Sequence, residues 1–152
     1  MKHTTVCYIE KDDSYLMLHR IKKEADENKD KWIGIGGKLE ASESPFECVR
    51  REVFEEVGLT LNSIRYAGFI TFVSNVFGTE YMHLFHCTDF SGTPDENCTE
   101  GVPSWVKKSD IPKLPIWEGD KIFLELLEKE RRFFSLKFEY NGDTLISHTL
   151  EF

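Results

Sequence analysis

The sequence predicts a mixed α/β fold in a single domain, with helices packed on a mixed sheet. Most of the chain alternates between polar turns and short segments rich in aromatic and β-branched residues, which are typical of strands. Two longer segments, about residues 45–57 and 118–132, instead carry apolar residues at helical spacing. The length of 152 residues suits one domain, and no repeat or linker divides residues 1–152.

The expected strands occur in three groups along the chain. Residues 4–10 and 15–20 form a pair joined by the polar turn at 11–14. Residues 64–74, 81–87 and 104–106 form the central group. Residues 133–140 and 144–150 flank Asn141 and Gly142, a dipeptide that favours a hairpin turn.

The segment at 45–57 has the clearest local signature of a helix. Ser44 suits the N-cap, Pro45 suits the first helical position, and Glu47 can complete a capping box with Ser44. Gly58 can adopt the left-handed conformation that ends a helix. The apolar stripe expected to face the sheet consists of Phe46, Val49, Val53 and Val57. The corresponding residues of the helix at 118–132 are Ile122, Leu126 and Leu127.

Charge and hydropathy exclude several classes of function. The net charge of −8 disfavours stable binding to nucleic acid or to an anionic membrane, and no apolar run approaches the roughly 20 residues of a membrane span. The first residues, MKHTTVCYIE, do not resemble a secretory signal, so we expect a cytoplasmic protein of undetermined oligomeric state. A small anionic substrate is compatible with this charge if a bound metal or local cations neutralise it. The four cysteines lack metal-binding spacing, and we expect buried free thiols at Cys7, Cys48, Cys87 and Cys98.

Three carboxylates meet on one face of the helix at 45–57. Glu52, Glu55 and Glu56 stand at i, i+3 and i+4, so their charges repel one another. A solvated acidic surface is the ordinary explanation of such a helix face. A bound cation is the functional alternative, and oxygen ligands favour Mg²⁺, with Mn²⁺ as a possible substitute.

The spacing around these carboxylates favours the functional alternative. Gly37 is followed after five residues by Glu43, and after seven more by the run REVFEEVGL at 51–59. This pattern resembles the box of the Nudix hydrolase superfamily at every defined position. The resemblance implies an α/β/α sandwich and metal-dependent hydrolysis of a phosphoanhydride bond in a small nucleotide.

The resemblance also implies roles for individual residues. Arg51 would orient the carboxylates, mainly through Glu55, and Glu43 would brace the junction between loop and helix. Glu56 is the first choice for the general base that deprotonates the attacking water, with Glu55 and Glu100 as alternatives. The implied metal ligands are a backbone carbonyl at Gly36 or Gly37 and the side chains of Glu52, Glu55, Glu56 and Glu100.

Motifs over nearly the whole chain resemble one branch of this superfamily, the MutT-like enzymes. They include WIGIGGK at 32–38, Pro103-x-Trp105 and Trp117-x-x-Asp120. The branch hydrolyses oxidised purine nucleoside triphosphates, such as 8-oxo-dGTP, to the monophosphate and pyrophosphate. By resemblance, Trp117 would stack on the base and Asp120 would hydrogen-bond to its edge.

Other positions leave the substrate open. Arg20 and Lys38 are candidates for phosphate binding, with an ordinary surface position as the alternative for each. Ile33 stands where the branch has an asparagine that reads the purine, and Gly119 stands where it has a second aspartate. Without these groups the identity of the base is undetermined. The alternatives are another Nudix substrate (ADP-ribose, a dinucleoside polyphosphate or a capped RNA end) or a nucleotide-binding module without catalysis.

Overall fold

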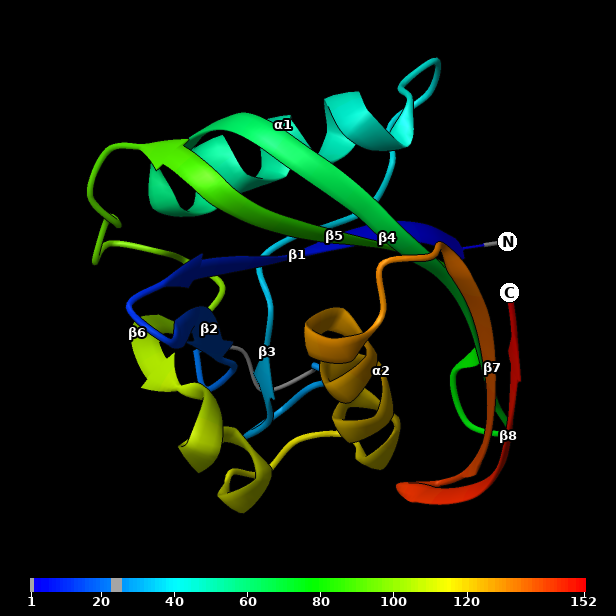
Figure 1. The fold of residues 1–152 in the computed structure, drawn as a ribbon. Helices are drawn as coiled ribbons and strands as arrows, with labels where there is room; N and C mark the ends of the chain where they lie inside the picture. The colour runs from blue at the N-terminus through cyan, green and yellow to red at the C-terminus, as the bar shows by residue number, and fades with distance from the viewer. Residues whose placement is uncertain (1, 23–25) are drawn as a thin grey trace.

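The computed structural model describes residues 2–22 and 26–152, and its strands build a curved sheet with helices on both faces (Figure 1). The elements are β1 (Lys2–Lys11), β2 (Ser14–His19), β3 (Trp32–Ile33), α1 (Pro45–Val57), β4 (Thr60–Ser74), β5 (Gly78–Ser91), β6 (Val102–Lys107), the 3₁₀ helix η1 (Lys108–Lys113), α2 (Glu118–Lys129), β7 (Phe134–Asn141) and β8 (Thr144–Glu151). No helix in these two ranges is long and apolar enough to cross a bilayer.

The sheet is mixed, as the sequence predicts. Its strands follow the order β3-β2-β1-β5-β4-β7-β8, and β6 also pairs with β2. The β1 and β5 strands are parallel, as are β4 and β7, whereas the other pairs are antiparallel. In Figure 1, α1 covers one face of β1, β4 and β5, while α2 lies on the other face, where β7 and β8 curve around it. The α/β/α sandwich implied by the resemblance is confirmed.

Alternation along β1 separates two cores. Cys7 and Ile9 belong to the core beneath α1, whereas Val6 and Tyr8 belong to the core around α2. Lys2 and the even-numbered residues that follow it therefore face the α2 side of the sheet. All four cysteines are buried free thiols, as expected.

The ends of α1 agree with the sequence prediction. Ser44 Oγ accepts the Glu47 N–H at 3.1 Å, and Glu47 Oε1 accepts the Ser44 N–H at 2.9 Å, which completes the capping box. Gly58 is left-handed with φ of 72°, and its N–H donates to Phe54 O. These caps fix the rotation of the helix about its axis, and this rotation determines where its glutamates point.

Two details of the helices differ from the prediction. Phe46 is 38% exposed, with its ring packed edge-on against Phe85, and the fully buried residue of that turn is Cys48. The α2 helix ends at Lys129 rather than at residue 132. Glu130 adopts an extended conformation there, and its carboxylate accepts the backbone N–H groups of the next two residues.

The central strands β4 and β5 are longer than the sequence indicates. They pair with each other from Thr60 opposite Ser91 to Ser74 opposite Gly78. The pairing contains three register shifts, and these interrupt the alternation of polar and apolar residues. The sequence pattern therefore identifies only the regular middle part of each strand.

Candidate functional site

The glycine segment before α1, residues 34–37, lies directly against β1. The Thr5 N–H donates to Gly37 O at 2.8 Å. A Cβ atom at Gly36 would lie 1.9 Å from Thr5 O, so this backbone approach requires glycine. A Cβ atom at Gly37 would lie 2.4 Å from the carboxylate of Glu52. The segment thus joins the sheet to α1 and places Gly37 beside an acidic side chain.

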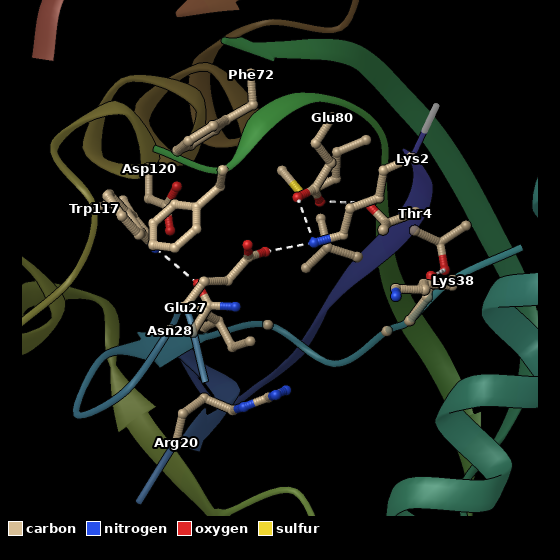
Figure 2. A pocket seen from close by; sticks show the side chains of 18 of the residues that line it. Lys2, Thr4, Arg20, Glu27, Asn28, Lys38, Phe72, Glu80, Trp117 and Asp120 are labelled. Atoms are coloured by element: carbon tan, nitrogen blue, oxygen red, sulfur yellow. Dashed lines mark hydrogen bonds and ion pairs between the residues drawn. The ribbon is translucent and has the colours of Figure 1, made fainter. Parts of the chain in front are cut away.

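A cavity of about 760 Å³ lies between this segment, β1 and the start of α2 (Figure 2). Gly36 and Gly37 line it, so one end reaches the acidic face of α1, which carries Glu52, Glu55 and Glu56. Its volume is within the range of small-molecule sites. The five substrate-binding residues expected from the sequence all line this cavity: Arg20, Ile33, Lys38, Trp117 and Asp120.

Trp117 forms a wall of the cavity but is only 5% exposed. Its indole N–H donates to Asn28 Oδ1 at 2.8 Å. Phe72 and Tyr140 pack edge-on against the ring, with centroids 5.4 and 5.3 Å away, and Lys31 Nζ lies 4.5 Å from the ring centroid. The indole is therefore held firmly, with the Lys31 ammonium over one of its faces.

Asp120 is the buried acid of the cavity. It lies in the first turn of α2 and is 6% exposed. Burial raises its pKa to about 8, the charge of Glu80 adds to the rise, and Lys31 opposes it. Asp120 is therefore mainly protonated at neutral pH and can both donate and accept a hydrogen bond.

The stability of the protein should reveal this proton. Because the pKa of about 8 exceeds the ordinary 3.8, the native state between these values holds a proton that the unfolded chain has lost. Its stabilising contribution is complete at low pH and is lost as the pH rises toward 8. The melting temperature of Asp120→Asn, relative to wild type, should therefore increase from about pH 5 to about pH 8. The exposed Asp110→Asn is the control, and a pH-independent difference for Asp120→Asn would contradict the assignment.

At Ile33 and Gly119 this chain lacks the polar side chains of the MutT-like branch, and both positions are apolar. A Cβ atom at Gly119 would lie 2.7 Å from the Phe138 ring, and the Gly119 N–H donates to Tyr140 Oη at 2.7 Å. An aspartate therefore does not fit at this position. Ile33 lies in β3 and presents only apolar surface to the cavity.

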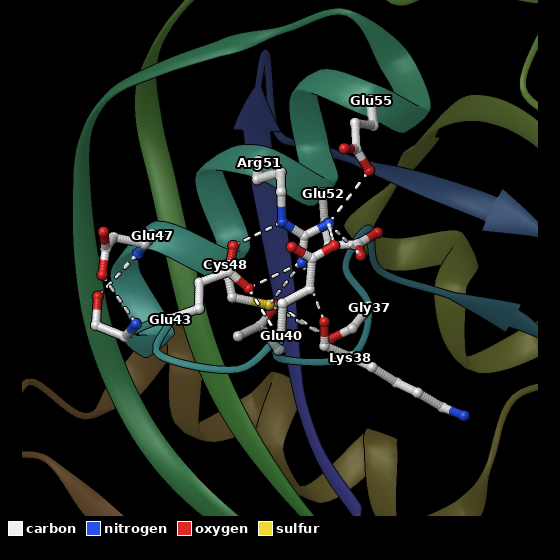
Figure 3. A network of polar contacts seen from close by, with 11 residues as sticks. Gly37, Lys38, Glu40, Glu43, Glu47, Cys48, Arg51, Glu52 and Glu55 are labelled. Carbon is white, nitrogen blue, oxygen red and sulfur yellow. Dashed lines mark hydrogen bonds and ion pairs between the residues drawn. The ribbon is translucent and has the colours of Figure 1, made fainter.

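Arg51 is the centre of a polar network on α1 (Figure 3). Its Nε and Nη2 atoms donate to the two oxygens of Glu43 at 2.6 and 2.9 Å, while Nη1 donates to Glu52 at 2.8 Å and to Glu55 at 3.2 Å. Nη2 also donates to Lys38 O at 3.1 Å. The hydrogen bonds from Arg51 lower the pKa of Glu43 to about 2. The main partner of Arg51 is thus Glu43, through a two-point contact, and not Glu55 as the sequence suggests.

Glu56 is the carboxylate that this network does not satisfy. Its Oε2 atom is buried and has no hydrogen-bond partner within the described chain. Burial raises its pKa to about 8, the charges of Glu52 and Glu100 add to the rise, and Arg20 opposes it. A buried oxygen of this kind destabilises the protein unless a ligand, water or cation satisfies it.

Arg20 connects the cavity to this acidic region. Its Nε atom donates to Asp26 at 2.7 Å, and its Nη2 atom lies 3.3 Å from Glu100. Lys38, which follows Gly37 in the chain, also lines the cavity. Arg20 and Lys38 thus give the cavity two cationic side chains, and the charge of Arg20 also acts on Glu56.

The acidic face of α1 fits a divalent cation. Three features favour a hard ion with oxygen ligands: a Glu56 oxygen that no described residue hydrogen-bonds, the repulsion from Glu52 and the closeness of Gly37 to Glu52. Gly37 O accepts the Thr5 N–H at 2.8 Å and longer contacts from Thr5 Oγ1 at 3.5 Å and Cys48 Sγ at 3.7 Å, so it would have to exchange one of the longer contacts to join a metal site. As the side chains stand in residues 2–22 and 26–152, no three acidic, histidine or cysteine groups form a complete ligand set. Arg51 holds two of the carboxylates aside, so a metal would require them to rotate.

Several polar residues of the cavity are not identified by the sequence. They come from β1, from β5 and from the loop before β3, and only the tertiary fold brings them together. The sequence holds a signal for one of them. Side chains alternate between the two faces of a strand, so Lys2 shares with Val6 the face of β1 that points toward α2. These additional lining residues are Lys2, Glu27, Asn28 and Glu80.

Comparisons relate the chain to known proteins. The model of the NUDIX domain matches residues 1–127. The chain is 33% identical over 124 residues to the oxidized purine nucleoside triphosphate hydrolase of Danio rerio, over 80% of this chain and 78% of that protein. It is 32% identical over 123 residues to the protein of the same name from Mus musculus, over 79% and 77%. The crystal structure of a MutT protein from Bacillus halodurans matches with a TM-score of 0.88 and 28% identity, over 99% of this chain and 98% of that one.

Proposed function

Because the chain belongs to the Nudix family and is a hydrolase of nucleotide phosphoanhydride bonds, we propose that it is a Mg²⁺-dependent pyrophosphohydrolase of purine nucleoside triphosphates. The products are a nucleoside monophosphate and pyrophosphate, and Mn²⁺ can replace Mg²⁺. The names of the animal relatives favour oxidised purines as substrates. Among these, 8-oxo-dGTP is the substrate that the MutT-like resemblance implies.

One observation carries this proposal. Among the described residues, no group hydrogen-bonds to the buried Oε2 atom of Glu56, which lies on an acidic helix face beside a cavity that suits a nucleotide. Gly37 connects the two features. It lines the cavity, and a Cβ atom at this position would lie 2.4 Å from the Glu52 carboxylate. A substrate with its base near Trp117 and its phosphates near Glu56 would span both.

The acidic residues have separate tasks in the proposed reaction. A bound divalent cation would neutralise phosphate charge and lower the pKa of a bound water. Arg51 positions Glu52 and Glu55, and Glu43 fixes Arg51 from the loop side. We assign proton transfer from the attacking water to Glu56, because its Oε2 atom has no hydrogen-bond partner within the described chain and a bound cation would lower its raised pKa and keep it ionised. Glu55 is a weaker candidate because its side chain is 58% exposed and bound to Arg51.

At the other end of the cavity, recognition of the base depends on few polar groups. Trp117 offers an aromatic surface, and Asp120 offers a carboxyl group that can donate and accept. Ile33 and Gly119 contribute no side-chain hydrogen bond. Selectivity between oxidised and normal purines therefore depends largely on Asp120 and on the lining residues from other strands.

A substrate panel tests the proposed function. The measurement is kcat/KM at one Mg²⁺ concentration for dGTP, 8-oxo-dGTP, 2-hydroxy-dATP, ADP-ribose and diadenosine polyphosphates, with the products separated by chromatography. We expect the highest values for purine triphosphates, with the oxidised forms preferred. A preference for ADP-ribose or a dinucleoside polyphosphate would assign a different Nudix substrate. Absence of turnover with every compound would indicate a nucleotide-binding module instead.

A further inference from the structure

We propose that Lys2 is a specificity-determining residue of this cavity, whose ammonium group donates to a carbonyl oxygen on the edge of the bound base. This contact favours 6-oxopurines, of the guanine type, over 6-aminopurines, of the adenine type. The inference rests on the proposed function, because it requires that the cavity take the base of a nucleotide.

Two carboxylates hold Lys2 at the wall of the cavity (Figure 2). Its Nζ atom lies 2.5 Å from Glu27 Oε1 and 3.3 Å from Glu80 Oε1. Glu80 is itself fixed, because its Oε2 atom accepts the Thr4 hydroxyl at 2.6 Å. The Lys2 side chain remains 31% exposed. An ordered ammonium group therefore borders the space that a base would enter.

Lys2 keeps its charge in this position. Burial lowers its pKa, but the hydrogen bond to Glu27 and the charge of Glu80 outweigh this effect, so the pKa is raised overall. An ammonium group has three N–H donors, and the two carboxylates engage two of them. One donor is left for a ligand.

The acidic end of the site restricts how a base can lie. With the phosphates beside Glu56, the base cannot turn freely to present another edge to Lys2. Where a 6-oxopurine has an acceptor oxygen, a 6-aminopurine has N–H donors, which would face the N–H donors of the ammonium and leave both sides unpaired. Lys2 thus supplies the kind of polar contact that Ile33 and Gly119 cannot make.

Binding of dGMP and dAMP, measured by titration calorimetry, tests this inference without requiring turnover. A hydrogen bond from a charged donor corresponds to a preference of roughly 10- to 100-fold for dGMP in wild type. Lys2→Met should remove most of this preference by weakening dGMP binding, and Lys2→Gln, which keeps a neutral donor, should retain part of it. Lys11→Met is the matched control, because Lys11 is exposed at the other end of β1. Thermal unfolding establishes that each variant is folded.

Glu27→Gln separates a direct contact from a role in holding the loop. If Lys2 acted only by holding Glu27 and its loop, Lys2→Met and Glu27→Gln would weaken both nucleotides alike, and this result would overturn the inference. Wild type without a preference, or without binding of either nucleotide, would overturn it too, as would an unchanged preference in Lys2→Met. A protein that binds dGMP selectively but hydrolyses no triphosphate would contradict the proposed function alone.

Discussion

Glu56→Gln should lower kcat by roughly 10³-fold or more at saturating Mg²⁺ and leave the fold intact. A bound cation would lower the raised pKa of Glu56, so the substitution removes a negative charge from the occupied metal site and also removes the residue assigned as general base. The fold should persist because Glu56 Oε2 makes no hydrogen bond within the described chain, so no contact of that atom is lost. Steady-state kinetics with a purine triphosphate, together with thermal unfolding, measures both effects.

Glu47→Gln is the matched control on the same helix. Glu47 belongs to the capping box and lies outside the acidic cluster, so its substitution should leave kcat unchanged. Near-wild-type kcat in Glu56→Gln would remove Glu56 from the mechanism. Equal losses in the two variants would mean that the effect comes from the helix as a whole.

Gly37→Ala should lower kcat by roughly 10²-fold with little change in stability. The new Cβ atom would lie 2.4 Å from the Glu52 carboxylate, and this flexible side chain would have to move away from its place on the acidic face. Displacement of a catalytic group by about 1 Å is sufficient for a loss of this size. The measurement is kcat at saturating Mg²⁺, with the melting temperature determined in parallel.

Gly36→Ala provides the contrast at the neighbouring position. Its Cβ atom would lie 1.9 Å from the backbone oxygen of Thr5, which cannot rotate away. We therefore expect a loss of stability of about 3 kcal/mol, at the upper end of the range for overpacking. If Gly37→Ala destabilised the protein as strongly as Gly36→Ala, the segment would serve the fold alone, and its proposed part in the site would be wrong.

Local signals explain why α1 could be predicted from the sequence. The bounds Pro45–Val57 follow from a cap at Ser44 and a stop at Gly58, and both act through hydrogen bonds within a few residues. The gathering of the expected substrate-binding residues in one cavity follows from a resemblance that spans the chain. Phe46 is the exception within α1, because helical spacing alone does not show where the first turn leaves the sheet.

Tertiary contacts explain what could not be predicted. Arg51 binds Glu43 more closely than Glu55, because the loop folds back over the helix and offers both carboxylate oxygens. Lys2 and Glu80 meet only because β1 and β5 are parallel neighbours in the sheet, although they are far apart in the chain. The exclusion of a side chain at Gly119 likewise depends on Phe138, a residue of another element.

Metal-dependent pyrophosphohydrolysis is tested most directly by measuring the release of pyrophosphate from a purine deoxynucleoside triphosphate with and without a divalent metal. We expect equal amounts of monophosphate and pyrophosphate in the presence of Mg²⁺ or Mn²⁺, and no turnover once the metal is removed with a chelator. Release of inorganic phosphate in place of pyrophosphate, or undiminished turnover in the chelator, would contradict it.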